Sequence, residues 1–206
     1  MPIKMGITIS DNVSMTVESQ YLLISNREKC HKILLKNEKD RNDIIDFLIS
    51  LHLVLEIGLN GFYRKIILNQ LQKTIRITKI ANDLDSVSFI EKTVMFFTLP
   101  KFDFQDKINE ADKYYDAIGK IRNFSEIRNK LLHGHAIMEI SSNGTREQSR
   151  AFELLTEVNL QAQVNNFKFI MEAVEFYFEH MKNSNFTEHG KNSLKKQFLY
   201  IDFLNI

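Results

Sequence analysis

The chain has 206 residues, long enough to bury a substantial core without disulfides or metal, which excludes a disulfide-stapled miniprotein. Two prolines and seven glycines favour long helices over a sandwich of many short strands, which needs frequent turn residues. Because 27 basic residues balance 26 acidic ones, the net charge of +1 excludes an overall basic signature for nucleic acid, and any polyanion site must be local.

The sequence also indicates where the protein resides. Its single cysteine, Cys30, cannot form a disulfide within the chain, and no Cys/His spacing suits a structural zinc. Residues 1–7 lack the apolar core of a secretory signal, and the most apolar stretch, Leu48–Leu59, is shorter than the roughly 20 residues that span a bilayer. We therefore expect a cytoplasmic protein without membrane contact, metal or cofactor.

The first third of the chain predicts a short hairpin followed by helices. Residues 7–17 alternate apolar and polar on both sides of Asp11-Asn12, as in two strands joined by a turn. The apolar spacing over 18–35 is ambiguous and favours a broken helix, so an N-terminal extension over residues 1–39 is one interpretation. From residue 40 to 71, apolar residues recur every three or four positions, which predicts a long amphipathic helix.

The rest of the chain predicts further helices and a second hairpin. We expect helices over 85–98, 107–132, 159–181 and 191–200. Pro100 stops the first of them, and the second is expected to bend near Gly119. Strands over 136–140 and 150–154 flank a turn signal. No repeat or low-complexity linker divides the chain, so we predict one mainly α domain over 1–206, a bundle of four to five helices with small β-hairpin accessories.

The segment with the clearest chemistry lies at the end of the second of these helices. Arg128, Asn129 and His133 form the pattern R-N-x-x-x-H, and Gly134 follows at once, which suits a helix end. Asn129 and His133 are four residues apart and share a helical face, with Arg128 at its edge. The set supplies a permanent cation for phosphate, an amide, and an imidazole that titrates near neutral pH. These groups are the parts that metal-independent RNA cleavage requires.

This segment resembles the R-x4-6-H signature of the HEPN superfamily, in which a polar residue follows the arginine and the histidine ends a bundle helix. A long apolar helix before the motif and another long helix after it fit the same pattern. The resemblance implies a HEPN-like bundle and a homodimeric endoribonuclease of antiphage defence or a toxin–antitoxin system, restrained by an antitoxin or sensor protein. It also implies that Arg128 and His133 are catalytic and that Asn129 positions the phosphate.

Each of these residues also has a simpler interpretation. A histidine before a glycine can cap a helix, where the negative end of the helix dipole favours the charged imidazole of His133. Arg128 equally fits an ion pair with Glu126 or with a residue of another helix. The alternative function is therefore a non-catalytic HEPN-like module that binds nucleotide, RNA or a partner protein.

Basic residues near the motif supply the local charge that the whole-chain balance hides. Between Gly119 and His135, four basic residues accompany one acidic residue. Across a two-fold axis, two such patches would line a groove for an RNA backbone. The candidates for RNA contact are Lys120, Arg122, Lys130 and His135.

A row of polar residues recurs every four positions along the otherwise apolar long helix: His52, Glu56, Asn60 and Arg64. Because an unpaired buried carboxylate is costly, we expect Glu56 to bond within this row, to His52 or Asn60. The alternative places Glu56 or His52 in the cleft of Arg128, where they would orient its guanidinium or raise the basicity of the imidazole. His52 and Glu56 also have the helix spacing of metal ligands, but no clear third ligand accompanies them.

Overall fold

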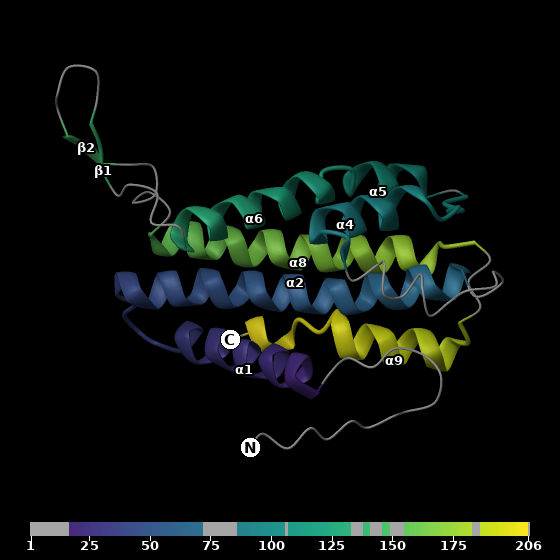
Figure 1. Ribbon diagram of the computed structural model, residues 1–206, viewed down its shortest axis with the longest axis horizontal. Coiled ribbons are helices and arrows are strands. Elements are labelled where there is room, and N and C mark those ends of the chain that lie inside the picture. Colours follow the sequence, from purple (N-terminus) through teal and green to yellow (C-terminus); the bar gives the residue numbers. More distant parts are fainter. Residues whose placement is uncertain are drawn as a thin grey trace.

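The computed structural model describes residues 17–71, 86–105, 107–132, 138–140, 146–148, 155–182 and 186–205. These residues are mainly helical, as the composition predicts (Figure 1). In chain order the elements are α1 (Val17–Leu34), α2 (Arg41–Leu71), α4 (Phe89–Thr98), α5 (Ile108–Lys113), α6 (Ala117–Leu132), β1 (Met138–Ile140), β2 (Arg146–Gln148), α8 (Glu157–Glu179), α9 (Glu188–Phe198) and the 3₁₀ turn η1 (Asp202–Leu204).

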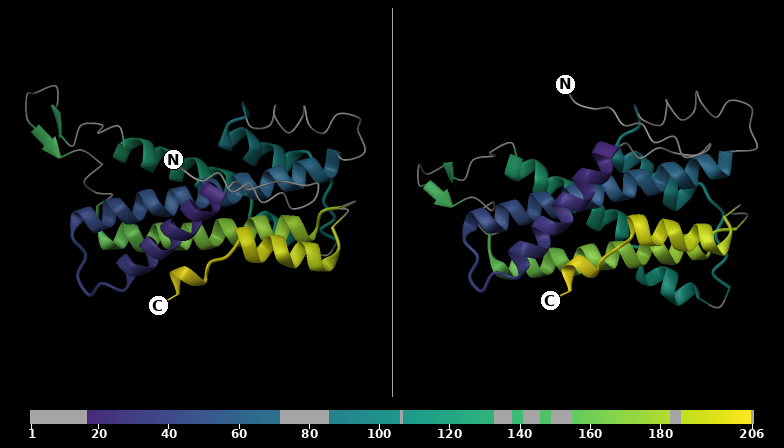
Figure 2. Two further views of the ribbon diagram at one scale, coloured as in Figure 1. Left: turned by 60° about the horizontal axis from the view of Figure 1, so that its bottom comes forward. Right: turned by 90° about the horizontal axis from the view of Figure 1, so that it is seen from below.

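The helices form three layers along the long axis of the molecule. α2 and α8 make the middle layer, with α4, α5 and α6 on one side of it and α1 and α9 on the other (Figure 1). α2 contacts α1, α4, α6, α8 and α9, while α6 packs on both α2 and α8. Figure 2 shows α1 crossing α2 obliquely. The long central helix is therefore the support on which α6, which carries Arg128, is held.

α2 forms where the spacing of apolar residues predicts a helix, and its bounds agree with the prediction to within one residue. The side chains on its apolar stripe are at most 2% exposed: Leu48, Leu51, Leu55, Leu59 and Phe62. Burying one such side chain contributes about 1.5–3 kcal/mol. The stripe therefore anchors the middle layer, and the predicted long helix is confirmed.

The same helix is apolar enough to pass a simple test for a membrane span. By length and composition, the 27 residues Arg41–Ile67 could cross a bilayer, and their most apolar 18-residue window has a mean hydropathy of 1.6. The apolar stretch thus extends beyond Leu48–Leu59, on which the sequence-based expectation rested. Of its most apolar window, 56% is buried inside the protein, and the core helix of a soluble protein passes the same test, so the finding is weak evidence for a span.

Two glycines of α2 allow α9 to pack closely against it. A methyl group on Gly61 would lie 2.5 Å from Cε1 of Phe198, and one on Gly58 would lie 3.2 Å from the Phe198 carbonyl oxygen. The Phe198 ring also packs edge-on against Phe62, with 6.4 Å between the ring centroids. The glycines thus set the distance between α2 and α9.

α1 is one continuous helix, so the prediction of a broken helix is wrong. Its apolar residues point in several directions, because Leu23 and Cys30 are buried while Tyr21 is 71% exposed. That scatter removes the single apolar stripe on which a helix prediction depends. α1 packs on α2 and on η1, so residues 17–34 of the proposed N-terminal extension lie within the bundle.

Side chains of α1 hold the C-terminal turn in place. Arg27 Nη2 donates to the carbonyl oxygens of Gln197 and Phe198, at 3.3 and 3.4 Å, at the end of α9 where carbonyls lack helical partners. His31 Nδ1 lies 3.0 Å from the Phe203 carbonyl oxygen of η1. Burial lowers the pKa of Arg27 to about 10, which leaves its guanidinium charged at neutral pH. These contacts join α1 to the C-terminal elements.

The predicted helix over 107–132 is two helices, and the break falls at residues 114–116. The Tyr114 amide donates to the carbonyls of Ala111 and Asp112, which tightens and closes the last turn of α5. Gly119 lies inside the first turn of α6 and is exposed. The sequence predicts a bend near Gly119, and the observed break ends three residues before that glycine. Gly119 itself is helical, because a helix tolerates an exposed glycine at a cost of only about 1 kcal/mol.

β1 and β2 pair in antiparallel register, with Glu139 opposite Glu147. The first strand falls within the predicted range 136–140. The predicted second strand, over 150–154, lies outside the described residues. Apart from Val17, so does the predicted N-terminal hairpin.

Candidate active site

Arg128 lies on the packed side of α6. Its helical neighbours Phe124 and Leu131 belong to the core or pack against it. Arg128 Nη2 lies 3.9 Å from Oε2 of Glu56 on α2, and both side chains are 29% exposed. Arg128 Nε is buried and has no hydrogen-bond partner among the described residues. The guanidinium is therefore partly covered by α2, faces a carboxylate there, and is still open to solvent.

His52 lies one turn before Glu56 and is 1% exposed. Its Nδ1 is 3.5 Å from the same Glu56 oxygen, and its Nε2 is 3.4 Å from Oγ of Ser125 on α6. Burial first, and the positive charge of Arg128 second, lower the pKa of His52 to about 4. The imidazole is therefore neutral at pH 7, although a carboxylate lies beside it.

The low pKa of His52 predicts a stability that is lost in acid. An unfolded chain has a histidine pKa near 6.5, so it binds the proton before the folded protein does, and stability falls as the pH drops from about 6.5 toward 4. Between pH 7 and pH 5 this group should remove roughly 2 kcal/mol from the free energy of unfolding. His52→Gln should reduce that loss in denaturant unfolding at the two pH values. The matched variant of an exposed histidine, His189→Gln, should keep the wild-type loss, and an unchanged loss in His52→Gln would contradict the assignment.

Sequence inspection missed Ser125 as a member of this cluster. Its Oγ meets His52 and also lies 3.4 Å from the Ile121 carbonyl oxygen one turn earlier. Ser125 precedes Arg128 by three residues, so the two side chains project from the same side of α6. That spacing becomes informative only once α2 is known to pack on this side.

The exposed side of α6 carries the other predicted contacts. Asn129, next to Arg128, is exposed, and so are Arg122 and Lys130. Arg122 and Asn129 are seven residues apart, close to two helical turns, and therefore share a face. The two neighbouring side chains of the motif therefore lie on different sides of α6, Arg128 toward α2 and Asn129 toward solvent.

Lys120, which was also predicted to contact RNA, is engaged within the protein. Its Nζ donates to Asn166 Oδ1 at 2.9 Å and lies 5.2 Å from the ring centroid of Phe169, and both partners belong to α8. The same Nζ is 3.7 Å from Oδ2 of Asp116. Lys120 therefore joins α6 to α8, and Arg122 and Lys130 are the more accessible cations.

His133 and His135 lie outside the described residues. α6 ends at Leu132, so the proposed imidazole follows directly on the last helical residue. Its position relative to Arg128 remains a prediction from the R-N-x-x-x-H spacing.

The structure supports part of each interpretation of the polar row on α2: pairing within the row, and contact with Arg128. Glu56 contacts His52, as pairing within the row predicts, and also Arg128, as the alternative predicts. Oδ1 of Asn60 is buried without a hydrogen-bond partner in the described part of the chain. Within the same residues, no group of three or more His, Cys, Asp or Glu side chains could hold a metal ion.

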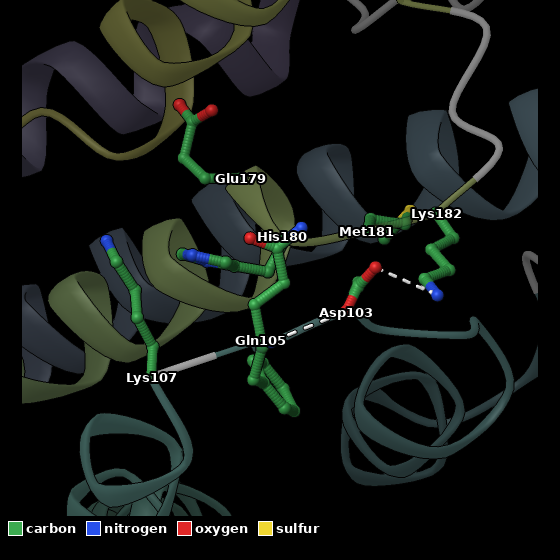
Figure 3. A pocket seen from close by; sticks show the side chains of 8 residues that line it. Asp103, Gln105, Lys107, Glu179, His180, Met181 and Lys182 are labelled. Atoms are coloured by element: carbon green, nitrogen blue, oxygen red, sulfur yellow. Dashed lines mark hydrogen bonds and ion pairs between the residues drawn. The ribbon is translucent and has the colours of Figure 1, made fainter.

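A separate pocket of about 330 Å³ opens at the C-terminal end of α8 (Figure 3). Asp103 and Lys182 form an ion pair of 2.9 Å on its wall, and His180 Nδ1 lies 2.7 Å from the Phe176 carbonyl oxygen. No residue of the Arg128 cluster lines this pocket. The candidate site is therefore the α2–α6 cluster and its exposed edge, and the pocket contributes nothing to it.

No protein-family model, curated protein or solved structure matches the chain. Chemically, the residues of the candidate site supply a partly exposed arginine side chain, a carboxylate and a neutral imidazole next to it, and an exposed amide.

Proposed function

We propose that the protein is a metal-independent endoribonuclease of the HEPN type. The observation that supports this best is Arg128, a cation that remains 29% exposed while Glu56 lies behind it. Such a guanidinium can bind a phosphate and stabilise the charge that develops on it during cleavage. Asn129 is exposed next to it and is assigned to positioning the phosphate. His133, five positions after Arg128 in the sequence, is assigned to proton transfer.

In the proposed reaction the 2′-hydroxyl of the substrate attacks the adjacent phosphate. His133 accepts the hydroxyl proton or donates one to the departing 5′-oxygen. Arg128 stabilises the added negative charge of the phosphorane. The products carry a 2′,3′-cyclic phosphate and a 5′-hydroxyl.

The resemblance to HEPN proteins extends the proposal to partners and setting. We propose a cytoplasmic homodimer in which two copies of the motif face one cleft, under the restraint of an antitoxin or sensor protein. The exposed Arg122 and Lys130, together with His135, would contact the RNA backbone. Growth arrest or antiphage defence would be the role of such an enzyme.

RNA cleavage in the presence of EDTA tests the proposed function. Purified protein should cleave a labelled RNA in EDTA, and mass spectrometry should find 2′,3′-cyclic phosphate ends. Arg128→Ala protein, purified in the same way, controls for contaminating ribonuclease. RNA that stays intact with and without divalent ions would contradict the proposal, and cleavage that EDTA abolishes would indicate a metal enzyme.

One observation favours a second function. The contact between Arg128 and Glu56 also resembles an ordinary ion pair between two helices. A non-catalytic module that binds nucleotide, RNA or a partner protein would retain this pair and cleave nothing. Measurable binding of RNA or nucleotide by protein that never cleaves RNA would support that function.

A further inference from the structure

A single carboxylate oxygen contacts both polar neighbours at the α2–α6 interface. Oε2 of Glu56 lies 3.9 Å from Nη2 of Arg128 and 3.5 Å from Nδ1 of His52. Arg128 Nε, on the same guanidinium, is buried without a hydrogen-bond partner among the described residues. Among the described residues, Glu56 is the acidic group that Arg128 contacts.

His52 lies beside this carboxylate, one turn earlier on α2. It is buried and neutral at pH 7, so one ring nitrogen carries a proton and the other accepts. Nδ1 lies 3.5 Å from the carboxylate but has no hydrogen-bond partner among the described residues. Nε2 lies 3.4 Å from Oγ of Ser125, whose hydroxyl donates to the Ile121 carbonyl oxygen. Because a neutral His52 does not cancel the charge of Glu56, that charge remains available to Arg128.

We propose that Glu56 is a positioning residue for Arg128. This inference rests on the proposed function, since it assumes a phosphate that Arg128 binds. Charge-assisted hydrogen bonds between guanidinium and phosphate are about 2.7–2.9 Å long, shorter than the 3.9 Å contact with Glu56. Glu56 therefore directs the arginine without holding it so tightly that it excludes the phosphate.

Glu56→Gln tests the proposal, because it keeps the shape of the side chain and removes its charge. Small displacements of a catalytic group lower rates by up to about 100-fold. We expect kcat for RNA cleavage to fall by about 10- to 100-fold, with little change in KM. Glu126→Gln, which removes an exposed carboxylate from the helix that carries Arg128, is the matched control and should leave kcat unchanged.

A double-mutant cycle separates positioning from a general structural role. In an Arg128→Ala background, Glu56→Gln should lower the residual kcat no further, because no guanidinium remains to be oriented. An equal loss in both backgrounds would mark Glu56 as merely structural and would overturn the proposal.

The Nε–H signal of Arg128 in nitrogen-edited NMR gives a measurement that does not depend on cleavage. Because Nε is buried, its proton should exchange slowly with water. Glu56→Gln should shift this signal and speed its exchange, whereas Glu126→Gln should not. If wild-type protein cleaves no RNA but the signal responds, the nuclease proposal fails and the positioning contact stands. If wild-type protein cleaves RNA while Glu56→Gln keeps full kcat and an unchanged signal, the positioning proposal is overturned.

Discussion

Arg128→Ala is expected to lower RNA cleavage by about 100- to 1000-fold, the range found when one preorganised donor to a developing anion is removed. His133→Ala should lower it by about 100- to 10,000-fold, the range for general acid–base catalysis. The cleavage rate of Arg128→Lys should lie between the rates of wild type and Arg128→Ala, because lysine keeps the charge but not the planar fork of donors. Initial rates on a labelled RNA in EDTA measure all three effects.

The structure provides the control for these variants. Because Arg128 and Glu56 are both partly exposed, removal of the arginine leaves a carboxylate that water can reach, and the protein should stay folded by circular dichroism. The control is Lys196, an exposed cation on α9, across the middle layer from α6. The Lys196→Ala variant should cleave RNA at the wild-type rate. Full cleavage in EDTA by both Arg128→Ala and His133→Ala would rule out the assigned site.

Phe62→Ala should be the most damaging single change to the core. Phe62 on α2 is completely buried and makes edge-on ring contacts with α4, α8 and α9, through Phe96, Phe178 and Phe198. Truncating a buried phenylalanine to alanine costs about 3–5 kcal/mol, as lost transfer energy and an unfilled cavity. A domain of ordinary stability has only about 5–15 kcal/mol in total.

Urea denaturation of Phe62→Ala and wild type measures this loss in the free energy of unfolding. Tyr115→Ala is the matched control, because Tyr115 is 87% exposed and its removal should change stability by less than about 0.5 kcal/mol. A Phe62→Ala variant within 1 kcal/mol of wild type would mean that the three ring contacts do not stabilise the folded protein.

The long helices could be predicted because their apolar residues form single stripes. α2 was placed to within a residue on that basis. α1 could not be predicted as one helix, since Leu22 and Ile24, like Tyr21, are largely exposed and obscure the period set by Leu23 and Cys30. Residues 114–116, where α5 and α6 separate, include no glycine or proline, and Gly119, three residues further on, indicates a bend in this region but not its exact position.

The candidate site was predictable only in part. The spacing of Arg128 and Asn129 is visible in the sequence, and the polar row on α2 suggested Glu56 and His52 as neighbours of Arg128. Which partner Glu56 meets depends on how α2 and α6 pack, and periodicity does not contain that information. Ser125 was missed for the same reason, since its role depends on a residue 73 positions away.

The contacts between α1 and the C-terminal turn also bear on the order in which the protein can mature during synthesis. The ribosome releases the chain from its N-terminus, so α1 and α2 emerge long before α9 and η1. Until Phe198 and Phe203 have emerged, Arg27 and His31 lack the carbonyl oxygens that they bind, and the face of α2 at Gly61 lacks its cover. The nascent chain therefore carries an incompletely covered apolar helix until α9 and η1 have emerged. Chaperones that bind such helices would have access to it until then.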